Sequence, residues 1–282
     1  MTWRIKVHHT TSYHYTGMVN TSYNEVRMTP LSVPGQTTID ARIDIRPAVR
    51  TYRYWDYWGT MVHAFDLHLP HDELTISATA VVDTSAPVLP GAADVVSWPV
   101  LAEDEQLDRW CELLSPTRYV PAEAELAAAA AEMAAALDPL DAALAATAWV
   151  HDHMTYTKGS TTVATAAHEA FKAGHGVCQD FAHILLAILR TMSIPSRYAS
   201  GYLYPDRDAI PGQVLAGQSH AWVEAWVGDW VALDPTYGGP ASEQHVLVAR
   251  GRDYADVPPL KGIYTGEPAK RLDVSVELTR VA

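Results

Sequence analysis

The pattern of apolar and polar residues divides the chain into an alternating first part and a helical middle. Up to about residue 85, apolar residues alternate with polar ones, most regularly over residues 3–7, 39–45 and 74–82. This period of two predicts half-buried strands, and short strands at this spacing indicate a β-sandwich-like domain over residues 1–85. Residues 86–100 are rich in proline and small side chains and are predicted to form a linker.

Helical spacing of apolar residues begins near residue 100. It predicts helices over residues 103–114, 122–137 and 139–154, and a short helix near residues 164–172. Alanine dominates the second of these segments, and alanine has the highest helix propensity. We interpret the alanine-rich faces as packing surfaces.

A loop with two glycines leads into the next predicted helix, and Cys178 lies at the junction. Gly174 and Gly176 precede it, and apolar residues recur at helical spacing from Phe181 to Met192. The helix is predicted to stop before Ser193-Ile194-Pro195, because proline cannot continue it. The first turn of a helix has unpaired N–H groups and favours negative charge, which suits a thiolate, the reactive form of cysteine. The glycines lack Cβ atoms, so a substrate backbone can approach closely. A buried structural cysteine is the alternative interpretation.

After this helix the apolar period returns to two. A strand is predicted over residues 196–204, followed by a polar loop over 206–217. Residues 219–227 and 230–236 are predicted to be two strands joined by a tight turn. A final alternating segment within residues 266–282 is expected to pack as a strand near the N-terminal domain.

A catalytic cysteine needs a base within hydrogen-bond reach and a third group that orients the base. His183 follows Cys178 by five positions on the same helix, and it therefore lies about 140° around the helix axis. His175 is too close along the chain for easy contact between its ring and the sulfur. His220 lies on a strand outside the helix and can face Cys178 across a cleft, with Asp234 on the partner strand.

The register of the predicted hairpin decides whether Asp234 can reach His220. A two-residue turn would place Asp234 opposite Val223 and on the other face from His220, because side chains alternate along a strand. A three-residue loop over 227–229, or one bulge, would place Asp234 opposite Trp222 and make it the diagonal neighbour of His220. The pairing of these two side chains therefore predicts an odd-length loop or a bulge.

Composition narrows the classes of partner and compartment. The formal net charge of −13 over 282 residues argues against binding to nucleic acid or an anionic membrane, because both need a basic face. The sequence has no apolar run of membrane-spanning length and no apolar signal-peptide stretch at its start. Its two cysteines, Cys111 and Cys178, favour a reduced, cytoplasmic chain in which Cys111 is an inert core thiol. The histidines of the first 85 residues match no metal-ligand spacing, so we predict no metal and no cofactor.

Four motifs together resemble the transglutaminase-like core of microbial proteins. In chain order they are Gly174–Ala182 (GHGVCQDFA), Arg197–Tyr202 (RYASGY), Ser219–Glu224 (SHAWVE) and Leu233–Thr236 (LDPT). Residues 1–85 resemble the β domain that often precedes this core in bacteria. The resemblance implies an α+β fold in which a papain-like helical part packs on an antiparallel sheet. The core would cover residues 101–265, and the C-terminal strand, 266–282, would return towards the N-terminal domain.

The same resemblance implies cysteine acyltransferase, protease or amidase chemistry. Cys178 would be the nucleophile, His220 the base and then the acid, and Asp234 the orienting group. The amide substrate would be a glutamine side chain or a peptide bond in a peptide or protein, a thioester would form, and water or an amine would accept the acyl group. The Cys178 N–H is the natural first oxyanion donor. Candidates for the second donor or for cleft positions are Tyr156, Trp149, Gly176, Asp180, Trp222 and Tyr202.

Two of these candidates also have structural interpretations, and so does the whole chain. Asp180 can be a helix cap, and Trp222 can be a packing residue. The alternative to an enzyme is a catalytically silent protein- or peptide-binding module that keeps the fold, because a fold does not establish a function. The complete set of cysteine, histidine and aspartate favours the enzyme. Protease, amidase and cross-linking enzyme share this machinery, and the motifs specify neither which of them applies nor an oligomeric state.

Overall fold

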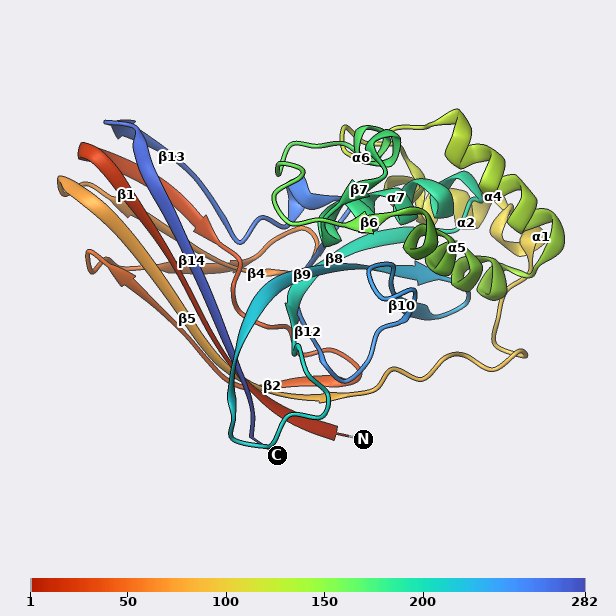
Figure 1. Ribbon diagram of the computed structural model, residues 1–282, viewed down its shortest axis with the longest axis horizontal. Coiled ribbons are helices and arrows are strands. Elements are labelled where there is room, and N and C mark those ends of the chain that lie inside the picture. Colours follow the sequence, from red (N-terminus) through yellow and green to blue (C-terminus); the bar gives the residue numbers. More distant parts are fainter. Residues whose placement is uncertain (1, 282) are drawn as a thin grey trace.

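The computed structural model describes residues 2–281, and its architecture is the predicted α+β fold, built on a long antiparallel sheet (Figure 1). Two strands near the end of the chain, β13 (Leu260–Gly266) and β14 (Ala269–Arg280), join the sheet of the N-terminal region. The strands that the N-terminal region itself contributes are β1 (Thr2–Val26), β2 (Gln36–Arg46), β3 (Tyr52–Trp55), β4 (Met61–Leu67) and β5 (His71–Ser85).

The long strand β1 is the centre of this region. Its first half pairs with β5 on one side and β14 on the other, and its second half pairs with β4 and β13. Figure 1 shows β14 running alongside β1. Trp3, Ile5 and Val7 are buried and the residues between them are exposed, because successive side chains of a strand point to opposite faces.

The rest of the chain forms the helical layer and the core part of the sheet. The helices are α1 (Trp98–Leu101), α2 (Asp104–Arg109), α3 (Cys111–Leu114), α4 (Ala124–Ala136), α5 (Pro139–His153), α6 (Ala167–Ala173), α7 (Cys178–Thr191) and the 3₁₀-helix η1 (Tyr254–Asp256). The strands are β6 (Thr155–Tyr156), β7 (His175–Gly176), β8 (Ser196–Leu203), β9 (Val214–Trp226), β10 (Trp230–Asp234), β11 (Gly239–Pro240) and β12 (His245–Gly251). No helix among residues 2–281 combines the length and the hydropathy that crossing a membrane requires.

Helix α7 is the centre of the helical layer. Every residue from Gln179 to Arg190 is buried, and the helix packs against α4, α5, α6 and the strand β9. A helix that is apolar on nearly all sides is stable only when other elements surround it. The helix ends at Thr191, within one residue of its predicted end before Ser193, and Ser193 itself adopts a positive φ of 60°.

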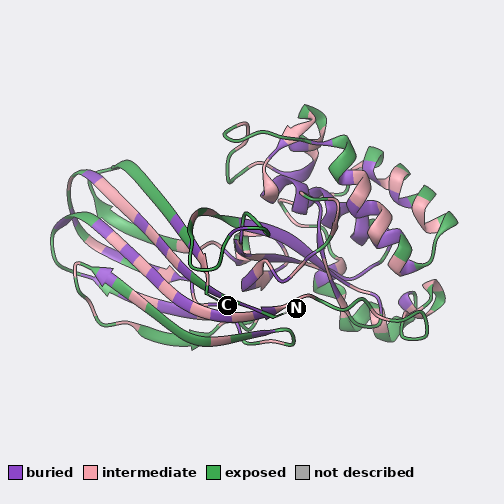
Figure 2. Cartoon of the chain, turned by 60° about the horizontal axis from the view of Figure 1, so that its bottom comes forward, coloured by how far each residue is buried: buried purple, intermediate pink, exposed green. Residues whose placement is uncertain are grey.

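One sheet connects the two parts of the molecule. In the core, β9 lies between β8 and β10, and β12 pairs with the outer side of β8. The first residues of β9, Val214–Gly217, pair instead with β14, which in turn pairs with β1. Trp3 and Ile5 of β1 belong to the same buried cluster as the apolar residues of α7. Figure 2 shows buried residues concentrated where the helices meet the sheet.

The prediction of one helix over residues 103–114 is wrong, because the segment is broken at Trp110 into α2 and α3. The Trp110 ring packs on Trp226 and Trp230, with ring centroids 5.3 Å away in each case. The position of Cys111 in the core was also predicted wrongly, since its side chain is exposed. The direction in which such a short helix faces depends on tertiary contacts of this kind.

Two further boundaries differ from the prediction. The loop predicted over residues 206–217 is shorter, because Val214 already pairs with Thr279 of β14. Helix α1 begins at Trp98, within the predicted linker of residues 86–100, and the indole N–H of Trp98 donates to the carbonyl of Leu137 at 2.9 Å. Both differences arise from contacts with segments far away in the sequence.

Candidate active site

Cys178 is the first residue of α7, and the short parallel pair of β6 and β7 brings Tyr156 close to it. Tyr156 pairs with Gly176, two residues before Cys178. Val177 is extended (φ −115°, ψ 178°), as an N-cap residue should be. The Cys178 amide is one of the first-turn N–H groups that have no acceptor within the helix. The cysteine side chain is half-buried.

The side chain of Asp180, the third residue of α7, caps the start of this helix. Its Oδ2 accepts hydrogen bonds from the Val177 N–H at 2.8 Å and from the Thr161 hydroxyl at 2.6 Å. Burial raises the pKa of the Asp180 carboxyl despite these bonds. A Cβ on Gly176 would lie 2.7 Å from that same Oδ2, and Gly174 has a φ of +71°. The backbone conformation of Gly174 and the closeness of Asp180 to Gly176 are therefore sufficient structural reasons for these two glycines.

The core hairpin has the odd-length loop that the sequence predicts. Trp230 pairs with Trp226, which leaves the three-residue loop 227–229 between β9 and β10. Asp234 consequently lies on the same face of the sheet as His220. The Nε2 atom of His220 lies 2.8 Å from Oδ2 of Asp234, and both side chains are buried.

The charges of this pair are set by their partners rather than by burial. Burial lowers the pKa of His220, but the hydrogen bond to Asp234 and the adjacent Cys178 outweigh burial and raise the pKa to about 10. Burial would raise the pKa of Asp234, yet hydrogen bonds from His220 and His245 hold it well below its usual range. Since Nε2 of His220 is bonded to Asp234, Nδ1 is the ring nitrogen available to the Cys178 thiol.

A cleft of about 350 Å³ opens beside His220, and two tyrosines line it. Burial raises the pKa of Tyr156, and Cys178 raises it further. Burial, Asp234 and Cys178, in that order, raise the pKa of Tyr237. Tyr156 is one of the predicted candidates, whereas Tyr237 was missed. Its position three residues after Asp234 was the available signal.

Three further residues were predicted as candidates for the cleft. Trp149 stacks on a histidine of its own helix, with ring centroids 3.9 Å apart. Tyr202 is buried, and its hydroxyl lies 2.9 Å from Nδ1 of His9, because its side chain faces β1. Trp222 packs parallel to His220, with ring centroids 6.2 Å apart. Among these three residues, the structure brings Trp222 to the histidine and leaves Trp149 and Tyr202 outside the cleft.

His245 is a second histidine on Asp234 that sequence reasoning missed. Its Nε2 lies 2.9 Å from the same Oδ2 that His220 contacts. Side-chain nitrogen and oxygen atoms of His220, Asp234 and His245 lie within 4.8 Å of one another. Among residues 2–281, this group has the kinds of donor atom that could hold a metal ion. The two N–O separations of 2.8 and 2.9 Å are the lengths of N–H···O hydrogen bonds, so we assign a hydrogen-bonded cluster.

Comparisons with known proteins show the family and the fold of this chain. Residues 5–83 match the bacterial transglutaminase-like N-terminal region, and residues 127–235 match the transglutaminase-like superfamily. An uncharacterized protein of Mycobacterium leprae is 46% identical over 280 residues, which cover 99% of this chain and 100% of that protein. The chain belongs to the transglutaminase-like superfamily. The superfamily segment contains all three residues of the predicted triad, and the match supports a family of thiol enzymes.

Two further relatives of this transglutaminase-like chain span nearly its whole length. An uncharacterized protein of Mycobacterium tuberculosis H37Rv is 34% identical over 301 residues, covering 98% of this chain and 93% of that protein. A solved structure from Cytophaga hutchinsonii, described as a candidate cysteine protease, has a TM-score of 0.79 at 23% identity and covers 99% of this chain and 98% of that one. This structure shows that both share the fold, including the N-terminal strands.

Proposed function

We propose that this transglutaminase-like protein is a cysteine enzyme that acts on an amide of a peptide or protein. The amide is a glutamine side chain or a peptide bond, and the acceptor is water or an amine. The observation that carries the proposal is the buried imidazole of His220, which lies 2.8 Å from the Asp234 carboxylate and whose pKa Asp234 and the neighbouring Cys178 raise. A silent binding module would gain nothing from this arrangement.

In the first half of the reaction, Nδ1 of His220 carries the proton that the Cys178 thiol has given up, as the raised pKa of His220 favours. The sulfur attacks the amide carbonyl carbon, and the carbonyl oxygen becomes an oxyanion. The Cys178 N–H donates to that oxyanion, and the Tyr156 hydroxyl is the second donor. When the tetrahedral species collapses, the C–N bond breaks, Nδ1–H of His220 protonates the departing amine, and a thioester remains on the sulfur.

In the second half, His220 acts as the base again. It takes a proton from water or from an acceptor amine as the oxygen or nitrogen attacks the thioester carbonyl. The C–S bond then breaks, the proton returns to the sulfur, and an acid or a new amide leaves. Asp234 remains a carboxylate throughout, because its hydrogen-bond donors hold its pKa well below the usual range. It orients His220 and stabilises the imidazolium that forms.

Alkylation with iodoacetamide, followed by intact mass and peptide mapping, tests this proposal. The exposed Cys111 is an internal reference thiol in the same sample. At pH 6 we expect Cys178 to react faster than Cys111. His220→Ala should slow Cys178 by roughly 100-fold, the lower range for loss of a general base, and leave Cys111 unchanged.

The matched control is His68→Ala, which removes an exposed histidine of the N-terminal region. It should leave both thiol rates unchanged. Equal, slow labelling of Cys178 and Cys111 that does not respond to His220→Ala would contradict the proposal.

The acceptor is tested separately with a glutaminyl peptide, in the presence and absence of a primary amine. Ammonia release without incorporation of the amine indicates hydrolysis, and incorporation indicates transfer. Cleavage of the peptide backbone instead indicates protease activity. Cys178→Ala should abolish whichever product forms, and a product that persists in that variant would show that another group is responsible.

A further inference from the structure

The carboxylate of Asp234 receives three hydrogen bonds, which is more than the orientation of one imidazole needs. Its Oδ2 lies 2.8 Å from Nε2 of His220 and 2.9 Å from Nε2 of His245. Its Oδ1 accepts a bond from the Thr236 N–H at 2.9 Å. Asp234 is 1% exposed, so these groups replace water as its solvent. The mechanism above uses His220 and leaves His245 without a role.

The tautomer of His245 follows from its second partner. The backbone N–H of Ser242 donates to Nδ1 of His245 at 3.0 Å. Because that N–H can only donate, Nδ1 must be the acceptor nitrogen of the ring, and the proton must lie on Nε2. His245 therefore donates to Asp234 as a neutral imidazole, in a direction that the Ser242 backbone determines.

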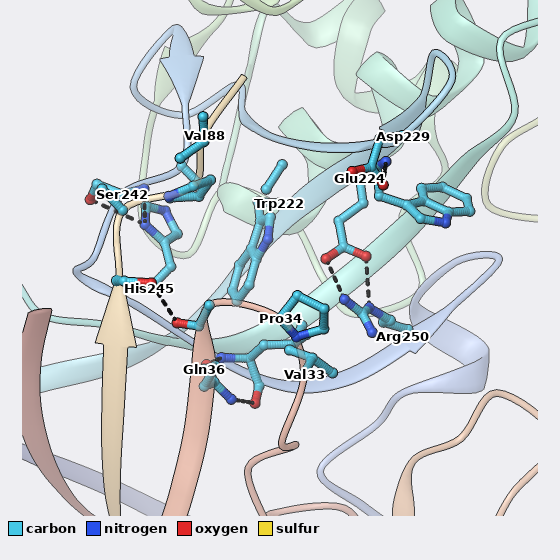
Figure 3. A pocket seen from close by; sticks show the side chains of 18 of the residues that line it. Val33, Pro34, Gln36, Val88, Trp222, Glu224, Asp229, Ser242, His245 and Arg250 are labelled. Carbon is cyan, nitrogen blue, oxygen red and sulfur yellow. Dashed lines mark hydrogen bonds and ion pairs between the residues drawn. The ribbon is translucent and has the colours of Figure 1, made fainter. Parts of the chain in front are cut away.

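Packing also restrains the His245 ring. His245 is the first residue of β12, and its ring meets Trp222 edge to face, with centroids 5.2 Å apart and planes at 77°. Figure 3 shows Trp222 between His245 on one side and the paired Glu224 and Arg250 on the other. These residues line a cavity of about 580 Å³ between the N-terminal region and the core. Trp222 and His245 line this cavity, and their ring centroids also lie 6.2 and 5.8 Å from that of His220.

We propose that His245 is a positioning residue of the triad: its Nε2–H holds Oδ2 of Asp234 in line with Nε2 of His220. This inference rests on the proposed function, because Asp234 acts on the thiol through His220. Without the second donor, the carboxylate can rotate about its Cβ–Cγ bond, and the carboxylate oxygen that meets His220 is less well placed. A hydrogen bond to a charged group contributes enough energy for about a tenfold effect on a rate.

The titratable groups around this cluster lie on three other elements and in the turn after β10. They are His220 on β9, Cys178 at the start of α7, Tyr156 on β6 and Tyr237 after β10. Asp234 and Cys178 both raise the pKa of His220, so weakening the hold on Asp234 should make the imidazole less basic. An NMR titration of the His220 imidazole should therefore show a lower pKa in a variant that lacks the His245 donor.

The test compares His245→Gln with His245→Met by iodoacetamide labelling from pH 5 to pH 9, with Cys111 as the internal reference. The two substituents have the same length, but glutamine keeps an N–H donor near the Nε2 position and methionine has none. We expect His245→Met to slow the labelling of Cys178 about tenfold at pH 6 and to lower the pKa of the His220 imidazole, followed by NMR. His245→Gln should stay within about threefold of the wild type. The thermal midpoint, measured in parallel, reports any structural loss that the two variants share.

The outcomes separate the two proposals. If the labelling of Cys178 in the wild type depends on His220, while His245→Met has the wild-type labelling rate and the wild-type pKa of His220, the role of His245 is contradicted and the proposed function stands. If Cys178 does not depend on His220, both proposals fail.

A measurement on the unaltered protein tests the same point should His245→Met fail to fold. The ¹⁵N chemical shifts of the His245 ring should show a protonated Nε2 and an unprotonated Nδ1. The opposite tautomer would overturn the inference, because Nε2 would then have no proton to donate.

Discussion

Two buried histidines in different parts of the molecule have opposite charge preferences. His9 lies in the N-terminal sheet and is 2% exposed, and His220 lies in the core hairpin and is 8% exposed. The partner of His9 is the neutral hydroxyl of Tyr202, and burial lowers its pKa to about 4. The partner of His220 is the Asp234 carboxylate, and the pKa of His220 rises to about 10 although burial opposes the rise.

This difference shows that burial alone makes a histidine neutral and that a buried, well-bonded carboxylate reverses the effect. His183 of α7 follows the pattern of His9. It is fully buried, its Nε2 accepts a bond from the Tyr254 N–H at 3.2 Å, and burial lowers its pKa to about 3. His220 differs because it combines a carboxylate with an adjacent thiol. The distinctive feature of the candidate site is therefore its electrostatics rather than its burial.

Asp234→Asn should remove this difference and have the largest effect. Asparagine keeps the size of the side chain but removes the charge, so the pKa of His220 should fall towards that of a buried neutral histidine. We expect the Cys178 labelling rate at pH 6 to fall roughly 100-fold. The rate relative to Cys111, measured by peptide mapping, checks this. A loss of less than about threefold would show that the carboxylate is not what charges His220.

The same variant should show a pH-dependent loss of stability. The raised pKa of His220 contributes stability in full below its ordinary value of 6.5, and this contribution is lost as pH rises to about 10. Because the pKa of Asp234 is lowered, its carboxylate stabilises the fold above the ordinary value of 3.8, and this contribution is lost as the pH falls below that value. The difference in thermal midpoint between wild type and Asp234→Asn should thus be greatest between about pH 4 and 6.5 and shrink towards pH 10. A difference that is constant with pH would contradict the ion pair.

His9→Asn tests the other side of the comparison. The lowered pKa of His9 means that the neutral ring contributes stability above 6.5 and loses it as pH falls towards about 4. Asparagine keeps a polar atom near the Nδ1 position and does not titrate. Between pH 7 and pH 5, the free energy of unfolding should fall by about 2 kcal/mol less in the variant than in the wild type, measured by urea unfolding. The labelling rate of Cys178 should not change, and an unchanged pH slope would contradict the assignment of His9 as a buried neutral group.

Asp180→Asn should have the smallest effect, because Asp180 is a buried carboxyl with neutral hydrogen-bond donors. Its pKa is raised by burial, whereas that of Asp234 is lowered by its histidine partners. The asparagine oxygen can still accept bonds from the Val177 N–H and the Thr161 hydroxyl. Because asparagine keeps the capping hydrogen bonds, we expect less than about a twofold change in the rate of Cys178 labelling. A loss as large as that of Asp234→Asn would mean that the charge of Asp180 is part of the site.

Local patterns in the sequence were sufficient to predict the elements that carry the candidate triad. The apolar spacing after Cys178 predicts α7, because a buried helix repeats its apolar residues with its own period. The requirement that Asp234 and His220 share a face predicts an odd-length loop or a bulge, because side chains alternate along strands, and the structure has a three-residue loop at 227–229. Each of these inferences depends on residues that are close together in the sequence.

The residues that sequence reasoning missed depend on long-range contacts. His245 reaches Asp234 from β12, and that strand pairs with β8 rather than with the hairpin. The spacing between Asp234 and His245 follows no local period and therefore gave no signal. The exposure of Cys111 likewise depends on how Trp110 docks on the hairpin tryptophans.

The most direct test of the central claim is an NMR titration of the His220 imidazole in the unaltered protein. We expect both ring nitrogens of His220 to be protonated at pH 8 and the ring to lose one proton only near pH 10. His9 should remain neutral at pH 8 in the same sample. A His220 ring that is neutral at pH 8 and titrates at or below 6.5, as an unpaired histidine would, contradicts the claim that Asp234 and Cys178 hold it charged.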